Sequence, residues 1–222
     1  MDKSDICTGF AVMAAPTEKL NTHMPKARFR HDTRDDYITI EGYAQRIAQV
    51  VEQVEVTRDR QPIRLQSALI ELKESFLECS ARGNKVILIG NGGSSAIASH
   101  IAVDLTKNHG IRAVSLNDFP TITCLSNDFG YAQVFAKQIE YYAHKDDCLV
   151  CISTGGKSPN ILNAVGAFHT LGGNRVYTFS GMKPDNALRS SGLINFYSHS
   201  YDFGIVEISH LTLLHSLCPC II

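Results

Sequence analysis

The chain has 222 residues, of which 44% are hydrophobic, and its 21 Lys and Arg residues nearly balance 22 Asp and Glu residues, giving a formal net charge of −1. This length suffices for one buried core, whereas the near-neutral charge offers no basic surface for nucleic acid or an acidic membrane. No apolar run reaches the ~18 residues that a transmembrane helix needs. The short apolar stretch 9–15 follows Asp2 and Asp5, where a secretory signal would carry positive charge. We therefore expect a cytoplasmic protein without nucleic-acid or membrane partners.

The first 36 residues form an extension in which Met, Ala, Thr, His and charged residues mix without a sustained hydrophobic period. We expect this extension to be disordered and residues 37–222 to form one domain. Apolar residues at helical spacing between Ile38 and Val54, and again between Leu65 and Gly83, predict two helices.

Beyond these helices, short apolar runs of β-type composition alternate with helical patterns. Five strands are predicted, at 85–89, 113–116, 148–153, 175–179 and 193–197. Such alternation is typical of a parallel sheet with helices on both faces, so we expect an α/β fold, a three-layer sandwich around a five-stranded parallel sheet. In such sheets, ligands bind at the carboxyl ends of the strands.

Two of these strands end in turns that favour an anion. The first runs into Gly90-Asn91-Gly92-Gly93-Ser94 and then into a helix, so free backbone N–H groups gather at the positive end of the helix dipole. The third runs into the turn 154–160, where Ser153, Thr154 and Ser158 supply hydroxyl donors. Together the turns suggest one phosphorylated ligand held from two sides, although either turn taken singly is compatible with a tight connection. Neither fits a nucleotide P-loop or a dinucleotide fingerprint.

The seven cysteines lie mostly in apolar surroundings. Cys148 and Cys151 have the spacing of a metal or redox pair, but on a strand, side chains three positions apart face opposite ways. We interpret them as core residues.

Two helical patterns carry the candidate chemistry. In the first, His100 and Asp104 are four positions apart, so they lie on one helical face and could share a metal ion, a substrate or a hydrogen bond. In the second, Glu207 and His215 lie on one stripe of a mostly apolar helix, where both need partners. A histidine on an apolar helix can equally be a core residue with satisfied hydrogen bonds, so the spacing alone leaves this choice open.

Several motifs together resemble those of sugar isomerase (SIS) domains of the phosphoheptose isomerase type. They are the turn 90–94 with His100 six residues later, the segment Asn127-Asp128-Phe129-Gly130, and the segment 152–160. The resemblance extends from about Tyr43 to Leu217. It implies the SIS fold, a sugar phosphate as ligand, and a homotetramer that uses the N-terminal helix and has its active sites between subunits.

The resemblance also implies a set of site residues. Asp104 and His215 stand at the catalytic positions, and His100, Asp104, Glu207 and His215 stand at the positions of a zinc site, with one Zn²⁺ per subunit. The substrate-binding positions fall at Asn91, Gly92, Gly93, Ser94, Asn117, Asp118, Ser153, Thr154, Ser158 and Glu207. Asp118 matches a position near the sugar hydroxyls, but it could equally be a helix cap.

The chain departs from the family pattern at several of these positions. Asp104 stands where the family has a catalytic Glu, which is one methylene longer, and Glu207 stands where it has Gln. Gly155 replaces a serine of the second turn, and Ile205 and Ile208 replace charged neighbours of the late Gln. His, His, Asp and Glu can still chelate Zn²⁺, but proton transfer is sensitive to the position of the base. We therefore expect an enzyme with altered catalytic positions.

The reaction that the resemblance implies is aldose–ketose isomerisation. The simplest substrate is sedoheptulose 7-phosphate, converted to D-glycero-D-manno-heptose 7-phosphate for lipopolysaccharide or capsule synthesis. One family branch is instead a non-catalytic homotetrameric adaptor for the bacterial replication initiator; it lacks the late histidine, so His215 favours catalysis. A ligand-sensing regulatory domain is a third hypothesis, but the 36-residue extension is too short for the DNA-binding module that usually accompanies one.

Overall fold

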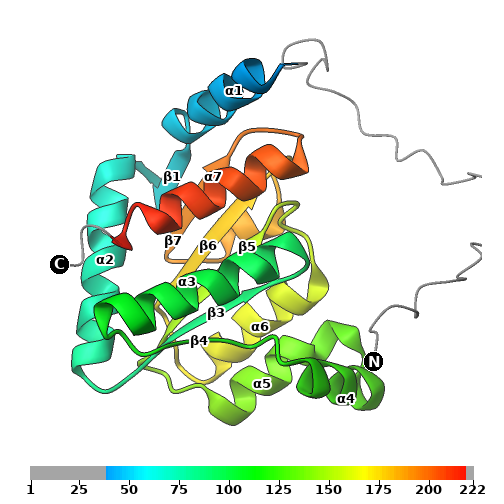
Figure 1. Cartoon of the computed structure of the whole chain (residues 1–222). Helices are drawn as coiled ribbons and strands as arrows, with labels where there is room; N and C mark the ends of the chain where they lie inside the picture. Colours follow the sequence, from blue (N-terminus) through cyan, green and yellow to red (C-terminus); the bar gives the residue numbers. More distant parts are fainter. Residues whose placement is uncertain (1–38, 219–222) are drawn as a thin grey trace, which may run out of the picture.

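The computed structural model describes residues 39–218 (Figure 1). The expected extension, the start of the first helical stripe at Ile38 and the last four residues lie outside the described residues. The helices are α1 (Ile40–Glu52), α2 (Leu65–Ala81), α3 (Gly93–His109), α4 (Phe119–Phe129), α5 (Val134–Tyr142), α6 (Pro159–Thr170) and α7 (Phe203–His215), with the short 3-10 helices η2 (Tyr131–Gln133) and η3 (Ala187–Ser190). The strands are β1 (Glu55–Arg58), β2 (Gln61–Ile63), β3 (Val86–Gly90), β4 (Ala113–Ser115), β5 (Cys148–Ser153), β6 (Val176–Gly181) and β7 (Ile194–Ser198). Within this described part, no helix has the length and apolar character needed to cross a membrane.

The strands form one sheet in the order β2-β1-β7-β6-β5-β3-β4. The five expected strands, β3 to β7, are all present and parallel, which confirms the expected α/β architecture. The expected number of strands is corrected from five to seven, because β1 pairs antiparallel with β7 and β2 pairs antiparallel with β1. The turn between β1 and β2 places Asp59 and Arg60 at positive φ values of 49° and 66°. It lacks the Asn-Gly or Asp-Gly pair that usually marks such a hairpin in a sequence.

Helices cover both faces of this sheet (Figure 1). On one face α2, α3 and α7 pack against alternate strand residues such as Val86, and on the other face α4, α5 and α6 pack against their neighbours such as Ile87. Cys148 belongs to the first of these core clusters and Cys151 to the second, and both are fully buried. Their interpretation as core residues that face opposite ways is therefore confirmed.

The N-terminal helix α1 stands at one end of the molecule and packs against α7 (Figure 1). Thr39 caps it, because the Thr39 hydroxyl accepts a hydrogen bond from the Gly42 N–H at 3.1 Å. Within α1 only Val50 is buried, whereas the side chain of Ile40 is 74% exposed. Residues 39–218 therefore cover the apolar stripe of this helix only in part.

Candidate functional site

The first glycine turn joins β3 to α3 at the carboxyl edge of the sheet. Gly92 is the N-cap of α3 and has a φ of 54° and a ψ of −124°, a conformation that residues with a Cβ atom rarely adopt. At Gly90, a Cβ atom would lie 2.6 Å from the backbone of Ser94, so the turn also requires a close approach there. The first N–H groups of α3 have no acceptor within the helix and stand at the positive end of its dipole. The turn therefore offers N–H donors to an anion.

The second turn joins β5 to α6 and is tied to the first by side-chain amides. Asn91 Nδ2 donates to Asn160 Oδ1 at 3.0 Å, and Asn160 Nδ2 donates back to Asn91 Oδ1 at 2.9 Å. The Tyr131 hydroxyl also donates to Asn91 Oδ1, at 2.8 Å. Because β3 and β5 are parallel neighbours, with Gly90 opposite Ile152, these bonds hold the two turns side by side. Both turns are thus placed to act on one ligand.

Hydroxyl groups of these turns lie mostly in enclosed positions. Ser94, Ser153 and Thr154 are 2%, 7% and 8% exposed. Ser158 is half-buried, and its Oγ lies 3.4 Å from Ser153 Oγ. Their contacts with a phosphate group stay predictions.

A cavity of about 160 Å³ opens beside the first turn. Its lining combines amide and hydroxyl groups with aromatic and aliphatic side chains: Gly90, Asn91, Gly92, Ser95, Asn117, Phe119, Ile122, Tyr131 and Phe135. Asn117 is held toward α3, because its Nδ2 donates to Ser95 Oγ at 3.0 Å and to Ser99 Oγ at 2.5 Å. Three of the expected substrate-binding residues, Asn91, Gly92 and Asn117, therefore line one cavity.

Asp118 is the N-cap of α4. Its carboxylate accepts hydrogen bonds from the Thr121 hydroxyl at 2.7 Å and from the Thr121 N–H at 3.1 Å. These bonds, chiefly the one from the hydroxyl, lower the pKa of Asp118 below its usual value. The helix-cap interpretation is confirmed, and contact with sugar hydroxyls stays a prediction.

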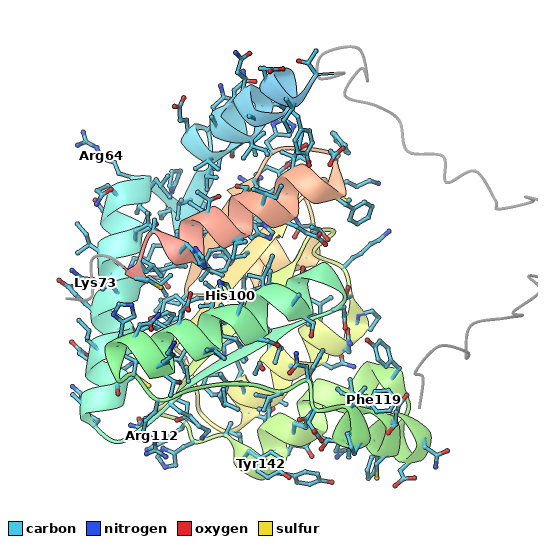
Figure 2. The ribbon with its side chains drawn as sticks, in the orientation of Figure 1. Arg64, Lys73, His100, Arg112, Phe119 and Tyr142 are labelled. Carbon is cyan, nitrogen blue, oxygen red and sulfur yellow. The ribbon has the colours of Figure 1, made fainter. Side chains whose placement is uncertain are left out.

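Three of the four expected metal ligands meet between α3 and α7; Figure 2 labels His100 on the side of α3 that faces α7. Asp104 Oδ2 lies 3.4 Å from His100 Nε2 and 3.4 Å from His215 Nε2. The centroids of the two imidazole rings are 4.8 Å apart. The side chains of His100, Asp104 and His215 are 52%, 21% and 45% exposed, so neither histidine is a core residue. We call these three residues the His-Asp-His cluster.

Glu207, the fourth expected ligand, does not join the His-Asp-His cluster. A Cβ atom at Gly93 would lie 2.5 Å from both carboxylate oxygens of Glu207, so this carboxylate lies against the first residue of α3. Burial raises the pKa of Glu207 above its usual value. Gly93 and His100 are seven residues apart, about 10 Å along the helix axis. Glu207 therefore lies with the first turn, and the α3 residues of the cluster, His100 and Asp104, lie further along the same helix.

The His-Asp-His cluster could hold a metal ion. One ligand atom from each of the three residues lies within 4.8 Å of the other two. Two imidazole nitrogens and one carboxylate oxygen form a donor set that zinc accepts, and catalytic zinc sites with three protein ligands keep a fourth position open. The donor set fits such an ion without Glu207.

A further histidine of α7, His210, faces the core. Its Nε2 donates to the Ser180 carbonyl oxygen at 3.1 Å, while its Nδ1 is buried and has no hydrogen-bond partner among the described residues. Burial lowers the pKa of His210 to about 4, so the ring is neutral at pH 7. At pH 7 His210 therefore joins α7 to β6 in its uncharged form.

Sequence reasoning did not assign a role to Tyr131 or Asn160. Asn160 ends the second turn, but its pairing with Asn91, 69 positions away, cannot be inferred from spacing. Tyr131 follows the segment 127–130, whose Gly130 has a φ of 80° and turns the chain from α4 into η2. The only signal in the sequence is that an aromatic residue, Tyr131, follows this turn, and that signal does not identify Asn91 as its hydrogen-bond partner.

Residues 42–179 match the SIS domain. The chain is 35% identical to the phosphoheptose isomerase of Helicobacter pylori (strain ATCC 700392 / 26695) over 168 residues, which cover 71% of this chain and 84% of that protein. It is 32% identical to the phosphoheptose isomerase of Roseiflexus sp. (strain RS-1) over 181 residues, which cover 78% of this chain and 91% of that protein. The solved structure of a phosphoheptose isomerase from Neisseria gonorrhoeae is similar with a TM-score of 0.69 at 28% identity, covering 82% of this chain and 96% of that one. The expected SIS fold and resemblance are confirmed: this chain belongs to the SIS domain family and is a relative of the phosphoheptose isomerases.

Proposed function

We propose that this protein is a phosphosugar isomerase that interconverts sedoheptulose 7-phosphate and D-glycero-D-manno-heptose 7-phosphate. The observation that carries the proposal is the placement of two functional groups on α3. The first turn offers its N–H donors at the start of this helix, and His100 of the His-Asp-His cluster lies about 10 Å further along it. A ligand anchored by phosphate at the turn can therefore extend toward the cluster. The relatives named phosphoheptose isomerase support the choice of substrate.

In this reaction the residues of the cluster move protons. Asp104 acts as general base and removes the proton from the carbon beside the carbonyl group, which gives an enediol. His215, 3.4 Å from Asp104, transfers a proton between the two enediol oxygens, and Asp104 returns its proton to the neighbouring carbon. The carbonyl group has then moved by one carbon. Holding the distant phosphate in the turns also raises the rate, because that binding energy orients the reacting carbons.

Zn²⁺ is the ion that we assign to the His-Asp-His cluster. Bound there, zinc would supply a Lewis acid for the carbonyl group. Each residue would give the ion one atom, so Asp104 would keep its second carboxylate oxygen, and His215 its second ring nitrogen, for proton transfer. Glu207 lies at the first turn, so we assign it to the sugar rather than to the metal. Elemental analysis after zinc loading should find one ion per subunit in the wild type and less than one in His100→Ala, whereas Glu207→Gln should keep its zinc.

Assembly into a homotetramer is part of the proposal. The described part of one chain covers the apolar stripe of α1 only in part, and Ile40, the first residue of this helix, is largely exposed. The cluster itself is half-exposed, which leaves room for a second subunit beside it. Multi-angle light scattering at micromolar concentration should give four times the mass of one chain, and a stable monomer would count against active sites shared between subunits.

A second candidate function is non-catalytic sugar-phosphate binding, as in the adaptor branch of the family. The observation that favours it is the short side chain of Asp104, which lies 3.4 Å from both histidines and is one methylene shorter than the Glu of the family pattern. Asp104→Glu separates the two functions. An isomerase should keep or raise its turnover in this variant and lose it in Asp104→Asn, which keeps the size of the side chain but removes the base.

The deciding experiment is incubation with a panel of five- to seven-carbon ketose and aldose phosphates, with and without Zn²⁺, followed by NMR of the products. We expect conversion of sedoheptulose 7-phosphate. If neither the wild type nor Asp104→Glu converts any sugar phosphate, and neither retains zinc after loading, the binding function should replace the enzymatic one.

A further inference from the structure

The backbone of the second turn is hydrogen-bonded to the segment 181–190, which runs from the last residue of β6 to the last residue of η3. The Gly181 N–H donates to the Thr154 carbonyl oxygen at 2.9 Å, and the Leu188 N–H donates to the Gly156 carbonyl oxygen at 2.9 Å. The backbone of the turn is therefore fixed at two points, both on the side of the neighbouring strand.

Asn186 is the residue around which this segment folds. Its Nδ2 donates to the Lys183 carbonyl oxygen at 2.8 Å, and to Gly181 O and Ser180 Oγ at 3.3 Å each. Its Oδ1 accepts a hydrogen bond from the Arg189 N–H at 3.0 Å, which makes Asn186 the N-cap of η3. The side chain is only 8% exposed. One amide group thus fixes both ends of the segment that supports the second turn.

Gly156 and Asn186 also determine each other's position. Gly156 has a φ of 59°, and a Cβ atom at this residue would lie 1.9 Å from Asn186 Oδ1. Real atoms do not approach so closely, so any side chain at Gly156 would displace either the turn or the amide. The positive φ adds a second reason for glycine at this position.

We propose that Asn186 is a positioning residue for phosphate binding, which sets the conformation of residues 154–156 without touching the ligand. The proposal rests on the phosphate role of the second turn in the proposed function, but it does not require isomerase activity. Without this amide, the segment 181–190 loses its central hydrogen bonds and the turn loses the surface against which Gly156 packs. The hydroxyl and N–H donors of the turn would then no longer converge on one position, and affinity for phosphate would fall.

The surroundings of Asn186 make it suitable for mutation. Asn186 is one of the residues that line a cavity of about 270 Å³, together with Thr57, Arg60, Pro184, Asp185, Arg189 and Ser190. Water can enter the space left by a truncated side chain from this cavity, so no dry void forms in the core. We therefore expect Asn186→Ala to fold.

The test compares Asn186→Ala with Asn195→Ala in the full chain. Asn195 is also buried, with 1% exposed, and its side chain is also hydrogen-bonded: Oδ1 accepts from the Gly192 N–H at 3.0 Å and from the Thr178 hydroxyl at 2.7 Å, and Nδ2 donates to the Gly192 carbonyl oxygen at 3.0 Å. It lies near the amino end of β7, however, whereas both turns follow the carboxyl ends of their strands. Both substitutions should lower thermal stability. Isothermal titration with inorganic phosphate should show a dissociation constant raised about tenfold in Asn186→Ala and changed less than twofold in Asn195→Ala. Zinc content should be unchanged in both.

Two further variants keep the proposal testable. Asn186→Asp preserves the size of the side chain but removes the Nδ2 donors, so it should weaken phosphate binding even if Asn186→Ala does not fold. Gly156→Ala should weaken phosphate binding more in the wild type than in an Asn186→Gly background, where the closest contact is gone. Equal effects of Asn186→Ala and Asn195→Ala on phosphate affinity, or additive effects of Gly156→Ala and Asn186→Gly, would overturn the proposal.

Failure of the proposed function looks different. If the protein binds phosphate, and its affinity depends on both Ser153 and Asn186, but it converts no sugar phosphate, the proposed isomerase activity is wrong and the positioning role of Asn186 stands. If wild-type protein binds no phosphate, or if Ser153→Ala leaves its affinity unchanged, the phosphate role of the turn is wrong and the positioning role falls with it.

Discussion

The two glycine turns and the His-Asp-His cluster differ in construction, although the first turn and two residues of the cluster, His100 and Asp104, belong to the same helix, α3. Most hydroxyl groups of the turns are buried, and the two turns are joined by hydrogen bonds of 2.8 to 3.0 Å between Asn91, Asn160 and Tyr131. In the cluster, by contrast, the nitrogen and oxygen atoms lie 3.4 Å apart, and the two histidines are about half exposed. The turns are thus preorganised by the sheet of a single chain, whereas the cluster is left open for an ion, a substrate or a second subunit to complete. This difference predicts that binding and chemistry can be impaired separately.

The largest expected effect is loss of chemistry without loss of binding. His215→Ala removes the residue that transfers a proton between oxygens, so turnover should fall by about 10²- to 10⁴-fold. Phosphate affinity should stay within twofold, because the side-chain hydrogen bonds that join the two turns, between Asn91, Asn160 and Tyr131, do not involve α7. His144→Ala is the matched control, since this histidine is exposed and lies in the loop before β5. Parallel loss of phosphate affinity in His215→Ala would show that the two regions act as one unit.

Acid should lower the stability of the fold through His210, which lies on the same helix as His215. The folded-state pKa of His210 is about 4, below its usual 6.5, so as the pH falls through this range the unfolded chain binds a proton that the folded chain excludes. The free energy of unfolding should therefore fall with pH, by at most about 3 kcal/mol from this residue. Denaturant unfolding at pH 7 and pH 4.5 checks this against His210→Gln, which cannot become charged. Identical pH dependence in the two proteins would exclude His210 as the source.

Loss of binding without loss of the metal site is the third expectation. Ser153→Ala removes a hydroxyl donor to a charged acceptor, which costs about 1.5–3 kcal/mol of phosphate affinity. Titration calorimetry should detect this loss, while zinc content stays at the wild-type level. Ser216→Ala, after the end of α7, is the control, because its hydroxyl donates to the Leu213 carbonyl oxygen and lies outside both turns. Unchanged affinity in Ser153→Ala would place the phosphate elsewhere.

The smallest effect is expected at Glu207, the residue of α7 whose carboxylate lies at the first turn. Burial raises the pKa of Glu207, so its protonated form is favoured by folding and its ionised form is disfavoured. Its contribution to stability is therefore fully present below the usual pKa of 4.5 and is lost as the pH rises through the raised value. Glu207→Gln should raise the melting temperature slightly at pH 7 and have no effect well below pH 4.5. A lower melting temperature at pH 7 would mean that the ionised carboxylate has a partner that stabilises it.

The sequence predicted those features that local pattern determines. Apolar runs located the five parallel strands, and glycines located the turn at Gly92, because few other residues adopt its backbone conformation. The spacing of His100 and Asp104 placed both on one helical face, and the resemblance added His215. The hairpin of β1 and β2 was missed because its Asp59-Arg60 turn has no glycine and its strands are short.

What could not be predicted depends on contacts between distant segments. The amide pair of Asn91 and Asn160 depends on the register of two strands, and the support of Gly156 by Asn186 depends on a loop 30 residues later. Glu207 is the reverse case, a contact that the sequence predicts and the packing of the helices does not form. Its spacing from His215 is that of the family's metal ligands, yet the way α7 packs on α3 directs its carboxylate to Gly93 instead.

The two edges of the sheet limit how copies of this chain can associate. One edge is β4, with three residues, and the other is β2, also with three residues, of which the central one is Pro62. Proline has no N–H to donate, and short strands offer few free backbone groups, so neither edge is a good template for an added strand. Copies of this protein should therefore resist association that extends the sheet, and contacts between them are directed to the helical surfaces, where side chains rather than backbone groups decide which partner fits.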